Sequence, residues 1–147
     1  MKGNLDKKDL QIMDYLRNHG RDKISEISEK TGIPRATIFE RITRLREEGY
    51  IRKFTVDLDL EKIGFPVMAY IMVAFDSGSG IDQRSLARKI SKLENVLSVS
   101  IISGQWDIMV HTISRSMKDL SVFVLDKLRS LEGVSNTLSI PVFEAVS

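Results

Sequence analysis

The stretch GIPRATIFERITRLREEG, residues 32–49, has the pattern of a helix that begins and ends sharply. Gly32 suits the left-handed reversal that ends a preceding helix. Pro34 suits the first turn of a new helix, because its missing N–H would be unbonded there anyway. A single buried face is indicated by three apolar residues at i, i+4 and i+7, namely Ile38, Ile42 and Leu45. The sequence therefore predicts a helix over residues 35–48, which the next glycine terminates.

Two shorter helices are predicted upstream of this one. Residues 6–18 carry an apolar stripe, formed by Leu10, Ile12, Met13 and Leu16. Asp22 can cap a second helix in which Ile24 and Ile27 face inward. Two short helices that are linked by a glycine turn form the helix-turn-helix signature, in which the second helix enters the major groove of DNA and the first fixes its depth. We therefore expect residues 1–50 to be a winged helix-turn-helix domain.

The charge distribution is compatible with this interpretation but does not decide it. Residues 1–57 have a net charge of +3 and residues 58–147 a net charge of −1, within a chain of net charge +2. The basic excess lies in residues 35–53, where six basic residues stand beside three acidic ones. A basic patch of this kind is what a phosphate-binding surface requires. A solvated helix face, with Glu and Arg paired at i, i+4 spacing, explains the same composition.

The candidate DNA contacts follow from the outward side of the third helix. Near its N-terminal end Arg35, Thr37 and Arg41 are expected to reach base edges, since arginine can bind guanine with two hydrogen bonds. Ala36, Glu40 and Arg44 are expected on the side opposite the core, together with Thr43 and Glu47. Phosphate contacts, which set register and affinity, are predicted for Arg44, Arg46, Arg52 and Lys53.

The pattern changes after residue 49. Residues 50–57 alternate apolar and polar side chains as a half-buried strand does, and residues 58–64 look like a connector. We therefore treat residues 51–64 as strand and linker and residues 65–147 as a second domain. The expected elements of that domain are strands over 66–75, 96–103, 106–114 and 134–146 and helices over 83–93 and 117–131, with a tight turn at Gly104-Gln105.

The order β-α-β-β-α-β is that of the ferredoxin-like fold, so the whole chain is predicted to be α+β. In this fold both helices cover one face of the sheet and the other face stays open. An open apolar face on so small a domain usually finds a partner, and we therefore expect a homodimer or a larger assembly.

Composition excludes several classes of protein. The chain has no cysteine, so disulfides, thiolate nucleophiles and cysteine-ligated metals are ruled out. No apolar run approaches the ~20 residues that cross a bilayer, and the first residues lack the apolar stretch of a signal peptide. We expect a cytoplasmic protein without membrane contact. His19 and His111, the only histidines, are not surrounded by further ligands in the sequence, so no metal, cofactor or catalytic residue is predicted.

Several short motifs stand in a specific order along the chain, namely residues 5–12, 18–21 and 32–33, Ile38 with Arg41-Ile42 and Leu45, then residues 48–51, 104–107 and 133–139. Taken together, they resemble the Lrp/AsnC (feast/famine) family of prokaryotic transcription regulators over essentially the whole length of the chain. Among these, Gly104-Gln105-Trp106-Asp107 matches the family's G-x-x-D turn. One position departs from the pattern: Pro34 stands where the family usually has a serine that caps the recognition helix, so the operator sequence cannot be copied from relatives.

The resemblance implies properties beyond those of the residues themselves. It implies a sequence-specific regulator of double-stranded DNA that pairs through its C-terminal domain, joins into octamers and binds a free amino acid near the G-x-x-D turn. By position, the candidates for the effector site are Ser103, Gly104, Gln105, Asp107 and Thr137. An aspartate suits an α-ammonium group, and backbone amides at a glycine turn suit a carboxylate. The plainer interpretation is that Gly104 and Asp107 only build a tight hairpin.

Two other functions remain open at this point. A haem-pathway decarboxylase of similar two-domain build would be an enzyme, but it should offer histidines to a tetrapyrrole and only two are present. A DNA-wrapping architectural protein would bind cooperatively with little sequence preference. We rank specific regulation first, architecture second and enzymatic activity third.

Overall fold

The computed structural model describes residues 4–146, and the chain divides into two compact units between Asp57 and Leu58. Each unit is described by itself. No helix in the described part of the chain is both long enough and apolar enough to cross a membrane.

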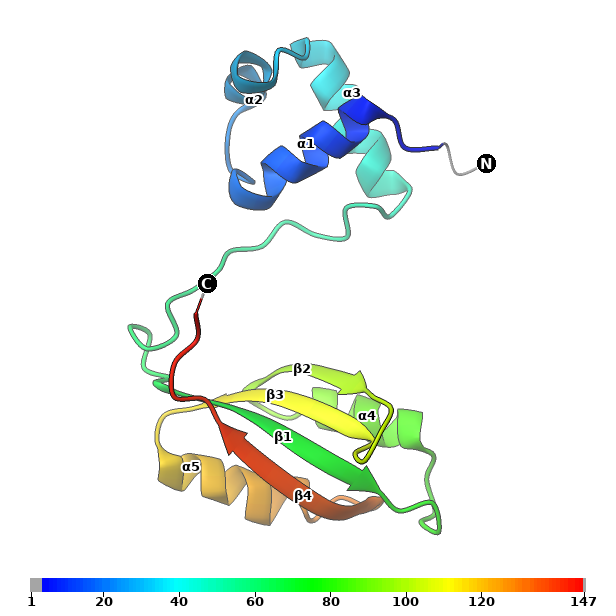
Figure 1. Cartoon of the computed structure of the whole chain (residues 1–147), viewed down its shortest axis with the longest axis vertical. Helices are drawn as coiled ribbons and strands as arrows, with labels where there is room; N and C mark the ends of the chain where they lie inside the picture. Colours follow the sequence, from blue (N-terminus) through cyan, green and yellow to red (C-terminus); the bar gives the residue numbers. More distant parts are fainter. Residues whose placement is uncertain (1–3, 147) are drawn as a thin grey trace. The chain divides into compact units, whose positions relative to one another are not determined.

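The N-terminal unit consists of three helices, α1 (Lys7–Asn18), α2 (Ile24–Thr31) and α3 (Arg35–Glu47) (Figure 1). Its core is a cluster of fully or almost fully buried isoleucines, namely Ile12, Ile27, Ile33 and Ile38. Gly32 adopts the left-handed conformation (φ 72°) between α2 and α3, and Gly49 does so (φ 80°) after α3. The predicted helix-turn-helix is therefore present, with the glycines where the sequence requires them.

Two details of these helices differ from the prediction. Leu10 is 54% exposed. A helix turns about 100° per residue, so Leu10 lies nearly opposite the buried Ile12, which is two positions later. Asp22 does not cap α2. Its carboxylate instead accepts a hydrogen bond from the Tyr15 hydroxyl (2.7 Å), and α2 begins after Lys23.

The strand predicted over residues 50–57 is wrong for this chain, because the structure has no strand there. A strand needs a neighbour to receive its backbone hydrogen bonds. Phe54 and Val56 are 46% and 74% exposed, and the described part of the chain pairs no strand with this segment.

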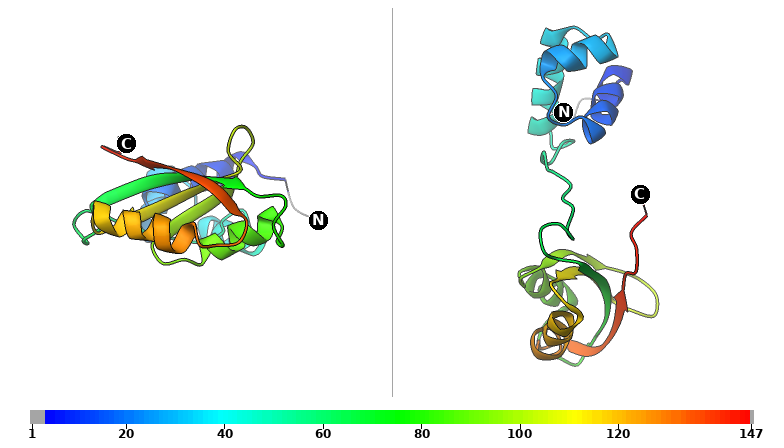
Figure 2. Two further views of the ribbon diagram at one scale, coloured as in Figure 1. Left: turned by 90° about the horizontal axis from the view of Figure 1, so that it is seen from below. Right: turned by 90° about the vertical axis from the view of Figure 1, so that its left-hand side faces the viewer.

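The C-terminal unit has the predicted β-α-β-β-α-β order. Its strands are β1 (Val67–Phe75), β2 (Val96–Ile101), β3 (Ile108–Ser114) and β4 (Val134–Pro141), and its helices are α4 (Gln83–Ser91) and α5 (Met117–Val122). The sheet is antiparallel with strand order β2-β3-β1-β4. Both helices cover the same face of the sheet, and the other face stays open (Figure 2). The fold is ferredoxin-like, as predicted.

Alternation along the strands separates the two faces of this sheet. Ala69, Ile71 and Val73 of β1 are fully buried beneath the helices with Leu86, Ile90 and Leu128. The intervening residues and their cross-strand partners form what we call the open face: Met68, Tyr70, Met72, Met109, His111, Ile113, Leu138 and Ile140. Leu138 and Ile140 are 45% and 44% exposed. A large apolar surface therefore lies on the side without helices.

Three boundaries in this unit differ from the prediction. The connection between β2 and β3 is not a two-residue turn, because Ile102 N–H bonds the Asp107 carbonyl (2.9 Å) and closes a wider loop that contains Trp106. The helix after Ser116 changes from α5 to a π-helical segment, η1 (Phe123–Leu128). In a π-helix the backbone hydrogen bonds span five residues and not four. The last strand ends at Pro141, after which the Val142 N–H still bonds β1, at the Met68 carbonyl (2.9 Å).

Candidate DNA interface and ligand site

The outward side of α3 is exposed, as a recognition helix requires. Arg35, Ala36 and Glu40 are exposed and Thr37 is half-buried. Arg46 in the last turn of α3, and Arg52 and Lys53 after the helix, are also exposed. Among the described residues no ion pair is formed by Arg35, Arg46, Arg52 or Lys53, so their charges are available to an external phosphate.

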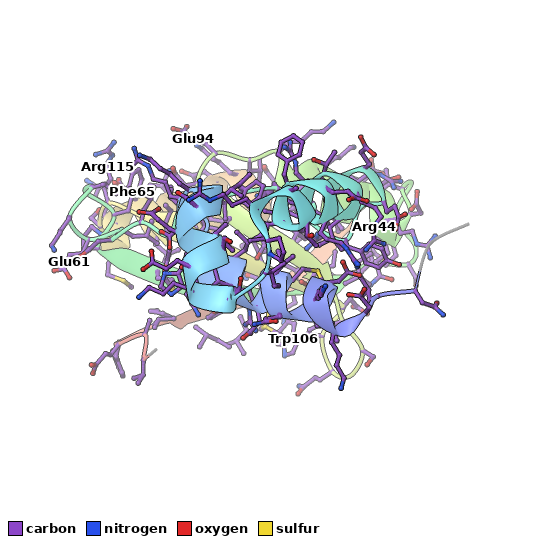
Figure 3. The ribbon with its side chains drawn as sticks, turned by 90° about the horizontal axis from the view of Figure 1, so that it is seen from above. Arg44, Glu61, Phe65, Glu94, Trp106 and Arg115 are labelled. Atoms are coloured by element: carbon purple, nitrogen blue, oxygen red, sulfur yellow. The ribbon has the colours of Figure 1, made fainter. Side chains whose placement is uncertain are left out.

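Arg41 and Arg44 are placed differently, because both reach from α3 to α1. Arg44 Nη2 donates to both carboxylate oxygens of Asp9, each at 2.7 Å, and Arg41 Nη1 donates to one of them at 3.0 Å. Arg41 Nη1 also bonds the carboxylate of Asp6. The side chain of Asp9 is fully buried. The prediction that Arg44 points outward is therefore wrong: Arg44 lies between α1 and α3 (Figure 3).

Asp6 and Asp9 also cap α1. Asp6 Oδ1 accepts the backbone N–H of Asp9 (2.9 Å), and Asp9 Oδ2 accepts the N–H of Asp6 (3.0 Å). This is a reciprocal capping box in which the third helical residue is aspartate. Each carboxylate therefore accepts hydrogen bonds both from a backbone N–H at the start of α1 and from an arginine of α3.

The ion pairs determine the titration of Asp9. Burial by itself raises the pKa of Asp9, but the hydrogen bonds from the Asp6 N–H, Arg44 and Arg41 outweigh burial and lower the pKa from the ordinary 3.8 to about 2. The pKa of Asp6 is lowered as well, by its bond from the Asp9 N–H and then by Arg41.

Acid should therefore destabilise the N-terminal unit in a defined range. A carboxylate with a depressed folded-state pKa stabilises the fold above its unfolded value and loses that contribution as pH falls through the folded value. Asp9 should thus contribute about 2 kcal/mol above pH ~4 that is lost towards pH ~2. Urea unfolding at a series of pH values measures this contribution. Asp9→Asn should be less stable at neutral pH and vary less over the same range; an equal slope in both proteins would contradict the assignment.

Sequence reasoning missed one exposed residue on α3. Phe39 is 63% exposed and lies beside a groove of about 620 Å³ that is also lined by Ile42, Arg46 and Phe54. Phenylalanine can contact the methyl group of thymine in the major groove. Its position, one residue from the buried Ile38, could have identified it, but an apolar residue beside a core position is easily read as core.

The five candidate effector residues gather at one end of the sheet. Ser103, Gly104 and Gln105 are exposed in the loop between β2 and β3, and Gly104 has a positive φ of 121°. Thr137 lies on β4, opposite Val73 of β1, while Ile108 at the end of the loop lies on the other side of Val73. The loop and Thr137 are therefore on either side of β1.

Asp107 holds this end of the sheet together. Its Oδ2 accepts the backbone N–H of Phe75 (2.8 Å), and its own N–H bonds the Val73 carbonyl (3.0 Å). Gln83, which sequence reasoning missed, donates from Nε2 to the Asp107 carbonyl (3.2 Å) and so fixes the loop to the start of α4. Asp107 therefore has a structural role in the hairpin, in addition to any role towards a ligand. No cluster that could hold a metal ion occurs among residues 4–146.

Comparison with known proteins agrees with both units. Residues 68–147 match the family described as Lrp/AsnC ligand binding domain, and residues 5–52 match the family described as winged helix-turn-helix DNA-binding.

Individual relatives span almost the whole chain. An HTH-type transcriptional regulator of Pyrococcus horikoshii is 36% identical over 142 residues, which cover 97% of this chain and 95% of the relative. A transcriptional regulator of Neisseria meningitidis, solved in complex with L-Met, has a TM-score of 0.91 at 28% identity and covers 98% of this chain and 93% of its own. Escherichia coli AsnC has a TM-score of 0.85 at 21% identity, with coverage of 97% and 95%, and shows the same fold.

Proposed function

The chain belongs to the Lrp/AsnC family of DNA-binding transcription regulators, and from this premise we propose that it recognises specific DNA sequences and responds to a free amino acid. The observation that carries the DNA-binding part is the exposed side of α3. A helix that follows a glycine turn offers Arg35, Ala36 and Thr37 at its N-terminal end, where base edges are usually reached.

Phosphate contacts would come from the charges that the fold leaves unpaired. Arg46 is exposed at the end of α3, and Arg52 and Lys53 are exposed in the segment that follows it. Exposed cations of this kind supply affinity without sequence preference. Arg44 is less suited to this role, because Asp9 already binds it.

The effector is proposed to bind beside the loop between β2 and β3. Two observations support this: the Neisseria relative was solved with L-Met, and the loop has an exposed glycine whose neighbouring amides can bind a carboxylate. Asp107 would attract the ammonium group, while Oδ2 keeps its bond to Phe75. An amino acid could alter assembly from this position.

Assembly is proposed to begin with a homodimer formed through the open face of the sheet, with dimers joining into octamers. Leu138, Ile140 and the methionines at positions 68, 72 and 109 make this face apolar, and burying apolar surface is the main driving force of association.

A mobility-shift assay tests the proposed function. The full chain is titrated against the promoter of its own gene and against random DNA of equal length, with each standard amino acid added in turn. We expect tighter binding to the promoter, altered by one amino acid or a small group of them. Equal affinity for both fragments would contradict sequence-specific regulation and favour a DNA-wrapping protein. No binding at low salt would contradict the function altogether.

Asp107→Asn should weaken effector binding without disturbing the fold. Asparagine Oδ1 can still accept the Phe75 N–H, so the hairpin should remain, but the negative charge for an ammonium group is lost. We expect wild-type thermal stability and DNA affinity without effector, and at least a tenfold loss of effector potency in the mobility-shift assay. The matched control Asp76→Asn removes a charge from the nearby exposed loop and should leave the response unchanged. An undiminished response in Asp107→Asn would contradict the proposed site.

A further inference from the structure

Two carboxylates at the start of α1 share the arginines of α3 unequally. Asp9, which is fully buried, binds Arg44 on both of its oxygens and Arg41 on one. Asp6 binds only Arg41, and its side chain is 48% exposed. Arg41 therefore lies between a buried and an exposed carboxylate, whereas Arg44 is held by the buried one and, more distantly, by Glu48 (3.6 Å).

These two kinds of ion pair differ in how readily they open. Removing a partner from a buried, hydrogen-bonded pair leaves an uncompensated charge in a dry environment, which is strongly unfavourable. An exposed ion pair changes an equilibrium constant by less than about tenfold, because water and salt screen the attraction between its charges. A DNA phosphate can therefore replace Asp6 as a partner of Arg41 at little cost, but it cannot replace Asp9 as the partner of Arg44.

The geometry also allows Arg41 to leave Asp6 without opening α1. Asp6 caps the helix through Oδ1, which accepts the Asp9 N–H, and it binds Arg41 through Oδ2. The cap thus remains when Arg41 moves. Arg41 lies in the middle of α3, and its side chain is 25% exposed, so part of it can be reached from solvent.

We propose that Asp6 and Asp9 determine which arginines of α3 reach DNA. Asp9 is a positioning residue that keeps Arg44 within the fold, and Asp6 holds Arg41 in the free protein until a phosphate takes its place. This proposal rests on the proposed DNA-binding function, and it adds that binding includes the exchange of one ion pair within the protein for one with DNA.

The test measures affinity for a random duplex as a function of salt, in the full chain, with thermal unfolding as a check that each variant is folded. Arg41→Met should lower the slope of log affinity against log salt by about 0.9, the loss of one phosphate contact. Asp6→Asn keeps an oxygen to cap α1 but removes the competing charge, so it should tighten binding by about 3- to 10-fold. In the Arg41→Met background, Asp6→Asn should have a much smaller effect.

Asp14→Asn is the matched control, because Asp14 is an exposed residue of α1, the helix that Asp6 caps, and makes no ion pair among the described residues. It removes one negative charge and should tighten binding by less than about twofold. If Asp6→Asn tightens DNA binding equally with and without Arg41, the effect comes from long-range charge alone. The proposed exchange of ion pairs would then be wrong. An unchanged salt slope in Arg41→Met, with wild-type binding intact, would overturn only this inference. Absence of binding by the wild-type chain would overturn the proposed function as well.

Discussion

Replacing Arg44 with methionine should lower the free energy of unfolding of the N-terminal unit by about 3 kcal/mol. Methionine retains much of the length of the side chain but leaves the buried carboxylate of Asp9 without its two hydrogen bonds of 2.7 Å. Urea unfolding followed by far-UV circular dichroism reports the helices of both units, so a transition seen only by this signal belongs to the N-terminal unit. Trp106, the only tryptophan, reports the C-terminal unit by fluorescence and should show an unchanged transition.

Arg46→Met is the control for this experiment. Arg46 is exposed, and its nearest aromatic contact is the Phe54 ring at 5.8 Å from guanidinium carbon to centroid, so its loss should cost less than about 1 kcal/mol. The two variants should behave oppositely on DNA: Arg46→Met should lower the salt slope, whereas folded Arg44→Met should keep it. Equal destabilisation by both variants would contradict the structural role of Arg44.

Gly133→Ala should destabilise the C-terminal unit by about 3 kcal/mol, combining about 1–2 kcal/mol from the backbone and about 1–3 kcal/mol from crowding. Gly133 has φ 96°, which alanine rarely adopts. A Cβ there would lie 3.3 Å from side-chain atoms of Phe75, Ile81 and Leu86, all of them packed in or against the core. Urea unfolding followed by Trp106 fluorescence measures the change.

Gly64→Ala separates the two contributions. Gly64 has nearly the same φ, 95°, but its added Cβ would meet only the end of the flexible Arg115 side chain, at 3.4 Å. It should therefore show the backbone cost alone, about 1–2 kcal/mol. If both variants lose the same free energy, crowding at Gly133 contributes nothing.

The sequence predicts the helices and strands of this fold well, because each follows from a pattern of residues that are close together in the chain. The buried face of α3 follows from Ile38, Ile42 and Leu45 at helical spacing, and the order of the second unit follows from alternating strands and amphipathic helices. The strand over residues 50–57 fails for the opposite reason. Alternation of side chains shows that a segment can form a strand, but only a neighbour supplies the hydrogen bonds, and this segment pairs with no strand in the described chain.

The candidate sites are predicted only in part. The resemblance located the loop around Asp107, and Arg35 and Thr37 follow from the helical wheel. The helical wheel of α3 places Arg44 on the solvent side, because a wheel of one helix takes no account of the neighbouring helix α1. Its partner Asp9 is 35 residues earlier in the chain, and no periodic pattern connects the two. The bond from Gln83 to Asp107 is of the same kind, since it joins residues 24 positions apart.

The division of the chain at Asp57 has a consequence for how tightly DNA is held. The C-terminal unit begins directly at Leu58, and hydrogen-bonded turns over residues 59–65 shorten the connection to β1 further. In the proposed dimer, binding by one N-terminal unit would keep the second one tethered close to the same duplex. Short connections give effective concentrations in the millimolar range, so two weakly binding units become one strong binder. Selectivity would then depend on the spacing of two half-sites along the duplex as much as on the bases that each α3 contacts.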